Sequence, residues 1–307
     1  MVHATGTSAM IRRLPRTDPS RGVGPTCILL LWCADRPGIT AAVADFVYRH
    51  GGNIVHAEQH VDREISVFFQ RVEFELEGFA LARDDIAAAF TPVADRFDMR
   101  WRVRFSDEVA RVAILVSREG HCLEDLLGRW RLGELGPVEI PLVVSNHPDH
   151  ADTAGFMELR YEHLPVTPET KPAQEQAILD LLEEHGVDLV VLARYMQILS
   201  GQFIDRYRDR IINIHHSFLP AFVGARPYHQ AYARGVKVIG ATAHYATEDL
   251  DEGPIIEQDV VRVTHKDHVA DLVRKGRDLE RLVLARAVRA HLEHRVLTYG
   301  RKTVVFL

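Results

Sequence analysis

The sequence has little cysteine, no long apolar run and no excess of positive charge. Its 307 residues include only three cysteines, an odd number with no CxxC pair, which disfavours a disulfide framework and a cysteine-based zinc site. The longest purely apolar run, residues 28–32, is far below the roughly 18 residues that a membrane-spanning helix needs. A net charge of -6 argues against binding to nucleic acid. We therefore expect a cytoplasmic protein that binds neither nucleic acid nor a membrane.

Signature motifs of several enzyme classes are also missing. No GxSxG sequence is present, which disfavours a serine hydrolase of the α/β type. Gly22-Val23-Gly24 lacks the third glycine and the preceding strand of a dinucleotide-binding loop. His56 and His60 stand four apart, but the glutamate between them is one place off the HExxH pattern and the segment is predicted to be a strand. This histidine pair is therefore not interpreted as a metal site.

The N-terminal third is expected to form a small domain behind a flexible leader. Residues 1–25 contain four arginines among Ser, Thr, Gly and Pro, without the apolar stretch of a secretory signal, and are predicted to be the leader. Residues 26–106 then read as strand, helix, strand, strand, helix and strand. This βαββαβ order predicts a small antiparallel sheet with two helices on one face.

From residue 110 to 307 strands and helices alternate, which predicts a larger α/β domain with a mostly parallel sheet. The strands are predicted at 112–116, 140–145, 187–192 and 211–214, and the helices at 123–132, 173–185 and 202–208. Two further strands, 236–245 and 254–263, and a long amphipathic helix, 268–294, follow.

The densest polar cluster follows the strand predicted at 211–214. In extended backbone, residues two apart share a face, so Asn213 and His215 project side by side. At the carboxyl end of a parallel sheet, where ligands bind, such an amide and imidazole can stabilise an oxyanion, each with about 3 kcal/mol. Asp251, in a later turn-rich loop, is a candidate to orient His215 and to activate a water.

A purely structural role is the alternative for each of these residues. The chain has 17 histidines, and any one of them is more often structural or exposed than catalytic. An aspartate in a turn is usually a turn former. Sequence spacing by itself leaves the convergence of the three side chains open.

Three segments, in this order and at this spacing, resemble the folate-dependent formyltransferase family. They are Asn213–Pro220 (NIHHSFLP), Gly240–His244 (GATAH) and Leu250–Ile256 (LDEGPII). The resemblance covers roughly residue 111 to the C-terminus. It implies that Asn213, His215 and Asp251 are the catalytic residues, that folate is the substrate, and that neither a cofactor nor a metal is used.

Two features resemble the deformylase branch of this family rather than the transferases. The turn Asp35-Arg36-Pro37-Gly38-Ile39 inside the βαββαβ pattern is similar to an ACT domain, which deformylases carry in front of the formyltransferase-like domain. Ser117–Cys122 has one glycine and an acidic residue where transferases of glycinamide ribonucleotide have a glycine-rich phosphate loop. The resemblance therefore implies hydrolysis of 10-formyltetrahydrofolate to formate and tetrahydrofolate, within one-carbon metabolism and linked to purine synthesis.

The resemblance also implies further binding residues. The segment after the strand at 187–192 and the loop after the strand at 236–245 are expected to bind the folate, mainly through backbone groups; their residues are Arg194, Tyr195, Met196, Ile198, Leu199, Ala246, Thr247, Glu248 and Leu250. An amino-acid effector is expected at the ACT-like turn, at Asp35, Pro37, Gly38 and Ile39. We also expect a homo-oligomer, of a size that the sequence leaves open.

Two other functions stay open at this point. One is transfer of the formyl group to an amine acceptor. The other is a non-catalytic regulatory protein that binds folate or an amino acid.

Overall fold

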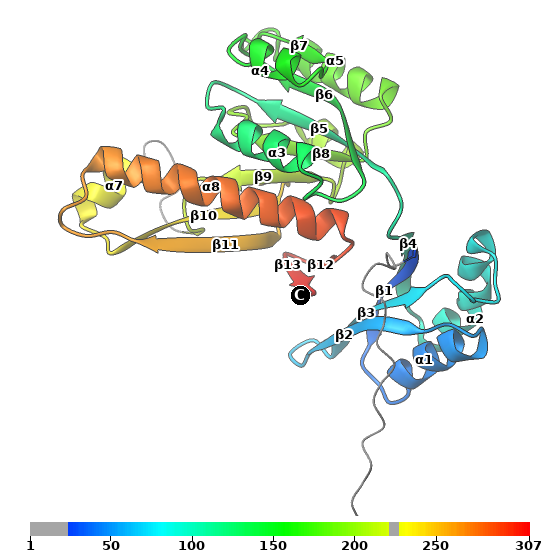
Figure 1. Ribbon diagram of the computed structural model, residues 1–307. Helices are drawn as coiled ribbons and strands as arrows, with labels where there is room; N and C mark the ends of the chain where they lie inside the picture. The colour runs from blue at the N-terminus through cyan, green and yellow to red at the C-terminus, as the bar shows by residue number, and fades with distance from the viewer. Residues whose placement is uncertain (1–23, 221–226) are drawn as a thin grey trace, which may run out of the picture.

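Two separate sheets and a short hairpin organise the computed structural model, which describes residues 24–220 and 227–307 (Figure 1). Most of the predicted leader, residues 1–23, lies outside the described residues. No helix within the described ranges is long and apolar enough to cross a membrane.

The first sheet has four antiparallel strands in the order β2-β3-β1-β4, which confirms the βαββαβ pattern. Its elements are β1 (Thr26–Ala34), α1 (Ile39–Arg49), β2 (Ile54–Asp62), β3 (Val67–Glu75), α2 (Ile86–Phe97) and β4 (Arg100–Phe105), with a short 3₁₀ turn, η1 (Arg83–Asp85), before α2. Strand β1 is apolar from Cys27 to Ala34 because both of its faces are covered. Leu29 and Leu31 pack under the two helices, whereas Ile28 and Leu30 pack on the opposite side.

The second sheet has seven strands in the order β11-β10-β9-β8-β5-β6-β7. Strands β5 to β9 are parallel, whereas β10 and β11 are antiparallel, so the predicted mostly parallel sheet is confirmed. The strands are β5 (Ala110–Val116), β6 (Val138–Ser145), β7 (Tyr161–His163), β8 (Leu189–Ala193), β9 (Ile211–His215), β10 (Val238–Tyr245) and β11 (Ile255–Arg262).

Helices cover both faces of this sheet. Apolar residues of α3 (His121–Arg131) and α8 (Val269–Leu292) form a core with one face, and those of α5 (Lys171–Glu184) and α6 (Gly201–Arg206) form a core with the other. Burial on both faces explains the unbroken apolar run of β8, whose five residues are all buried. Two short helices that the sequence did not predict complete this part, α4 (Ala151–Phe156) and α7 (Pro227–Arg234).

A C-terminal hairpin that the sequence did not predict connects the two sheets. Its strands are β12 (Val296–Tyr299) and β13 (Lys302–Val305). Leu297 and Phe306 are buried against Ile28, Leu30 and Phe69 on the face of the first sheet that α1 and α2 leave open (Figure 1). The hairpin therefore forms part of the core of the N-terminal sheet.

Candidate active site

Strand β9 places two polar side chains at the middle of the large sheet. Ile212 and Ile214 point into the core under α3 and α8, so Asn213 and His215 share the other face, as the strand period predicts. Asn213 lies opposite Leu192 of β8 and His244 of β10. Both candidate residues therefore stand where the parallel strand β8 ends.

The loop between β10 and β11 brings Asp251 to the same point. Asp251 Oδ2 lies 3.1 Å from His215 Nδ1, and its side chain is only 12% exposed. The loop is folded tightly, since a Cβ at Gly253 would come within 1.7 Å of the Tyr245 carbonyl oxygen. The three predicted catalytic side chains thus come from two segments that fold against each other.

His244 is a fourth member of this cluster, and the sequence reasoning did not assign it a role. Its ring is 2% exposed, and its Nδ1–H donates to the Tyr245 carbonyl at 2.9 Å. The Asn213 amide donates to His244 Nε2 at 3.2 Å, which fixes the orientation of the amide. Its position in the Gly240–His244 motif was the available signal, but the pairing with Asn213 depends on the antiparallel register of β9 and β10.

The histidines determine the charge of Asp251. Burial alone would raise the pKa of the carboxyl, but the hydrogen bond from His215 Nδ1 and the nearby His244 ring outweigh burial and hold the pKa well below its usual range. Asp251 is therefore a carboxylate at neutral pH. It can pair with an imidazolium at His215.

One nitrogen of His215 has no partner among the described residues. His215 is 6% exposed and its Nδ1 faces Asp251, whereas Nε2 is buried without a hydrogen bond. An unpaired buried polar atom costs roughly 1–3 kcal/mol. His215 lines a cavity, so a bound molecule could supply the missing partner.

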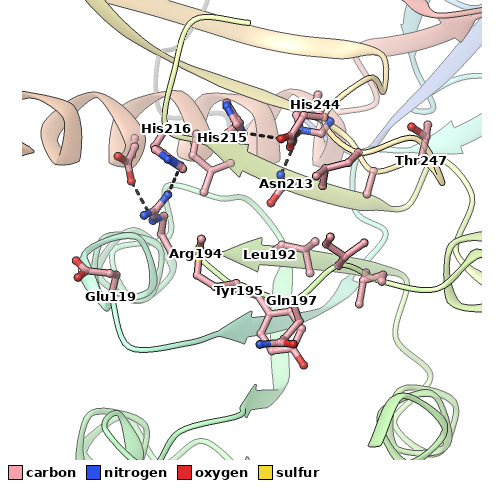
Figure 2. A pocket seen from close by; sticks show the side chains of 18 of the residues that line it. Glu119, Leu192, Arg194, Tyr195, Gln197, Asn213, His215, His216, His244 and Thr247 are labelled. Carbon is pink, nitrogen blue, oxygen red and sulfur yellow. Dashed lines mark hydrogen bonds and ion pairs between the residues drawn. The ribbon is translucent and has the colours of Figure 1, made fainter. Parts of the chain in front are cut away.

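The cavity has a volume of about 630 Å³ and contains every predicted catalytic and folate-binding residue in its lining. Figure 2 shows Asn213, His215 and His244 on one wall, with Leu192, Tyr195 and Gln197 on the facing wall. At one end the lining is apolar, and Met196, Ile198 and Leu250 are each more than half exposed there. Exposed apolar side chains around a concave site are typical of a surface that binds a flat organic ligand.

Hydrogen bonds hold the segment after β8 in place. The Ser117 hydroxyl accepts from the Met196 backbone N–H at 3.0 Å and donates to Asn146 at 2.7 Å. Tyr195 is buried, and its hydroxyl accepts from Gln174 at 2.9 Å. Tyr195 is therefore anchored in the core rather than free to contact a ligand with its hydroxyl.

The other end of the cavity is charged. Glu280 of α8 is 1% exposed and accepts from His121 Nε2 at 2.8 Å and from the Tyr228 hydroxyl at 2.6 Å. Arg194 Nε lies 3.4 Å from Glu280, and Arg194 Nη1 lies 2.7 Å from His216 Nδ1. Its guanidinium is therefore turned away from the apolar end, where a role in folate binding was predicted.

The same end contains a group of possible metal ligands. Atoms of His121, Cys122 and Glu280 lie within 4.8 Å of one another. Burial raises the pKa of the Cys122 thiol well above its usual value, and Glu280 is already bonded to His121. The bond between His121 and Glu280 and the buried, protonated thiol favour a structural role for this group.

The loop after β5 is filled by a side chain. A Cβ at Gly120 would come within 2.4 Å of the His150 ring, and His150 Nε2 lies 3.2 Å from the Arg118 carbonyl oxygen. The ring thus packs directly on Gly120. The absence of a phosphate cradle at Ser117–Cys122 stays a prediction.

The predicted effector residues lie at the start of α1, far along the chain from the cavity. Asp35, Pro37 and Gly38 are exposed, and Ile39 is buried. Gly38 has a φ of 96°, a conformation that favours glycine. Their role stays a prediction.

Comparisons with known proteins agree with this architecture. A family model described as formyl transferase matches residues 110–288, and an ACT domain model matches residues 28–89. The chain is similar to the formyltetrahydrofolate deformylases of Synechocystis sp., with 56% identity over 92% of this chain and 98% of the relative, and of Bacillus subtilis, with 48% identity over 91% and 93%.

Solved structures extend these similarities. The crystal structure of a formyltetrahydrofolate deformylase from Pseudomonas syringae is 49% identical, with a TM-score of 0.91 over 94% of this chain and 96% of that chain. A glycinamide ribonucleotide transformylase from Symbiobacterium toebii is 34% identical, with a TM-score of 0.62 over 66% and 97%. The resemblance inferred from the three motifs is confirmed.

Proposed function

Because the chain belongs to the formyltetrahydrofolate deformylase family, we propose that it hydrolyses 10-formyltetrahydrofolate to formate and tetrahydrofolate. The observation that carries the catalytic proposal is the convergence of Asn213, His215 and Asp251 beside a cavity, where the buried His215 Nε2 has no hydrogen-bond partner in the described part of the chain.

The formyl oxygen is the proposed partner of Asn213 and His215. Asp251 holds the proton on His215 Nδ1 and stabilises the imidazolium, whose Nε2–H then donates into the cavity. One amide hydrogen of Asn213 is used by His244, which leaves the second for the same oxygen. Each donor contributes about 3 kcal/mol to the tetrahedral intermediate.

Water is the proposed nucleophile. Its oxygen bonds to the formyl carbon, and the carbon–nitrogen bond to the folate then breaks. Asp251 positions the water and helps to move one proton of the water to the departing folate nitrogen. This proton binds the electron pair that the broken carbon–nitrogen bond leaves on the nitrogen. Water thus supplies a hydroxyl to the formate and a hydrogen to tetrahydrofolate. Folate is the substrate, and every step uses side chains of the chain itself and water.

The apolar end of the cavity is the proposed site for the pterin ring. Met196, Ile198 and Leu250 offer apolar contacts, while backbone groups of residues 194–199 and 246–250 supply hydrogen bonds. The bond from Met196 N–H to Ser117 keeps the first of these segments in one conformation before the substrate arrives.

The test is formate release from 10-formyltetrahydrofolate alone. We expect formate without any added amine, and a loss of about 1,000-fold or more in kcat for the His215→Ala variant. Formate that appears only with an amine would favour the transferase function. Binding of folate with no turnover would favour a non-catalytic regulatory protein.

Three further expectations belong to this proposal. An amino-acid effector binds at the Asp35–Ile39 turn. The chain forms a homo-oligomer, and the edge strand β2, where Val55 is 45% exposed, is a suitable surface for the contact between copies. The three free buried cysteines favour a reducing compartment such as the cytoplasm, where the formate would enter one-carbon metabolism and purine synthesis. Light scattering and assays with single amino acids test the first two.

A further inference from the structure

The charged end of the cavity suggests how the acceptor is chosen. The apolar end takes the folate in the proposed function, so a second reactant has to reach the formyl carbon from elsewhere. The remaining lining includes Glu119, His121, Arg194, Tyr228 and Glu280. Water needs little space there, whereas an amine needs both space and a group to receive its proton or positive charge.

Glu280 is the buried carboxylate at this end, and its oxygens are already occupied. His121 and Tyr228 donate to its two oxygens, and Arg194 neutralises its charge at 3.4 Å. The other carboxylate here, Glu119, is paired with Arg277. Both carboxylates therefore already have partners, and neither is free to bind an amine.

Arg194 is held in this position from both sides. Its guanidinium lies between Glu280 and His216, and the His216 ring stacks on the His215 ring with 5.0 Å between centroids (Figure 2). Arg194 also has a φ of 63°, in the left-handed region that glycine adopts most easily. A long side chain is thus held against His216, whose ring stacks on the proposed catalytic imidazole, at a backbone position where glycine would fit without strain.

We propose that Arg194, held by Glu280 and His216, is the specificity element that makes water the formyl acceptor. The proposal rests on the proposed hydrolase function. The guanidinium fills the space next to His216 and Glu280 from which an amine would approach His215, and it neutralises the buried carboxylate of Glu280 at that end. Arg194 acts by exclusion and does not touch the reacting atoms.

Removing the side chain should therefore open a second reaction. In an Arg194→Gly variant, the nitrogen of a primary amine would attack the formyl carbon, and the bond from that carbon to the folate nitrogen would break. The proton lost by the amine would pass to the folate nitrogen, which yields tetrahydrofolate and a formylated amine. Glu280, released from its cation, would hold the incoming amine.

The experiment measures how the formyl group is divided between the two acceptors. Substrate labelled with ¹³C in the formyl group is mixed with glycinamide near pH 8, and carbon NMR reports formate and formylglycinamide separately. The wild-type chain should give formate alone at every amine concentration. The Arg194→Gly variant should give a formylated fraction at least about tenfold above the wild-type background, rising with amine concentration. This fraction is a ratio, so a general loss of activity leaves it unchanged.

Two further variants control the result. Arg277→Gly removes the arginine that pairs with Glu119 in the lining of the same cavity but leaves Arg194 in place against His216, so it should still give formate alone. Arg194→Gly/Glu280→Gln opens the same space without leaving an unpaired buried charge, so it guards against misfolding of the single variant. It should form formylglycinamide, but less than the single variant.

The proposal is overturned if neither variant lacking Arg194 raises the formylated fraction above that of the wild type. It is also overturned if Arg277→Gly raises the fraction as much as Arg194→Gly. Failure of the wild type to release formate would instead overturn the hydrolase function, so the two failures are distinguishable.

Discussion

The two sheets hold their predicted sites in different ways. At the large sheet, Asn213, His215 and Asp251 come from separate segments, are largely buried and are bonded to one another or to His244. At the small sheet, the residues Asp35 to Ile39 are contiguous and mostly exposed. The first arrangement is preorganised for chemistry, whereas the second depends on what binds to it. Substitutions should therefore affect turnover strongly at the large sheet and weakly at the small one.

Asn213→Ala should lower turnover far more than any change at the small sheet. Removal of one proposed oxyanion donor should lower kcat for formate release by about 100- to 1,000-fold. The fold should survive, because within the described residues the amide is bonded to His244 alone and the side chain borders the cavity. Steady-state kinetics with circular dichroism as the folding control test this, and a kcat near that of the wild type would remove Asn213 from the mechanism.

His244→Ala should have the next largest effect. It leaves the Asn213 amide without the partner that orients it, so kcat should fall by about 10- to 100-fold with KM nearly unchanged. His229, an exposed histidine that lines the same cavity, is the matched control, and His229→Ala should stay within about twofold of the wild type. Equal losses in the two variants would contradict a positioning role for His244.

Acid should weaken the contact between the two sheets. Burial is the main cause that lowers the pKa of His291 to about 3 and that of His294 to about 4, and nearby positive groups are the second cause. Both histidines are therefore neutral in the folded chain at neutral pH. An unfolded chain binds a proton at each below about pH 6.5. The contribution of each neutral histidine to the free energy of unfolding is therefore complete above about pH 6.5 and declines as the pH falls towards 4. At pH 5 the free energy of unfolding is lower by about 1–2 kcal/mol per histidine.

Denaturant unfolding at pH 7 and pH 5 measures this decline. In His291→Gln the decline should be smaller than in the wild type, because one titrating group is gone. The same decline in both chains would show that other groups carry the acid sensitivity.

A substitution on the small sheet should have the smallest effect on turnover. Val55→Lys places a charge on the exposed edge strand β2 and should leave formate release within about twofold of the wild type. Light scattering on the same sample should show a smaller assembly if β2 carries the oligomer contact. A loss of activity comparable to that of Asn213→Ala would break the contrast between the two sheets.

Local patterns were enough to predict most of the fold. Strand β1 and helix α8 were found because a continuous apolar run and a 3.6-residue stripe are strong signals. The alternation of side chains along β9 predicted that Asn213 and His215 share one face, and the structure confirms this. The meeting with Asp251 needed the family resemblance, since no local pattern folds a distant loop onto a strand.

What the sequence missed depends on contacts between distant segments. The strands of the C-terminal hairpin are four residues each, and the role of Leu297 becomes evident only from its packing against Ile28 and Phe69. The ion pair of Arg194 and Glu280 joins the end of a strand to the middle of a later helix. Neither spacing nor composition indicates such a pair, because each partner alone looks like an ordinary surface charge.

The hairpin also bears on how the chain reaches its native state. Arg71 in β3 donates to the carbonyl of His294, 223 residues later. Leu297 and Phe306 of the C-terminal segment cover the face of the small sheet that α1 and α2 leave open. Such a non-local contact is slow to form, and until it forms the sheet presents an apolar side to the solvent. The ACT domain should therefore be prone to aggregation when produced without the remainder of the chain, and chaperones should associate with it during synthesis.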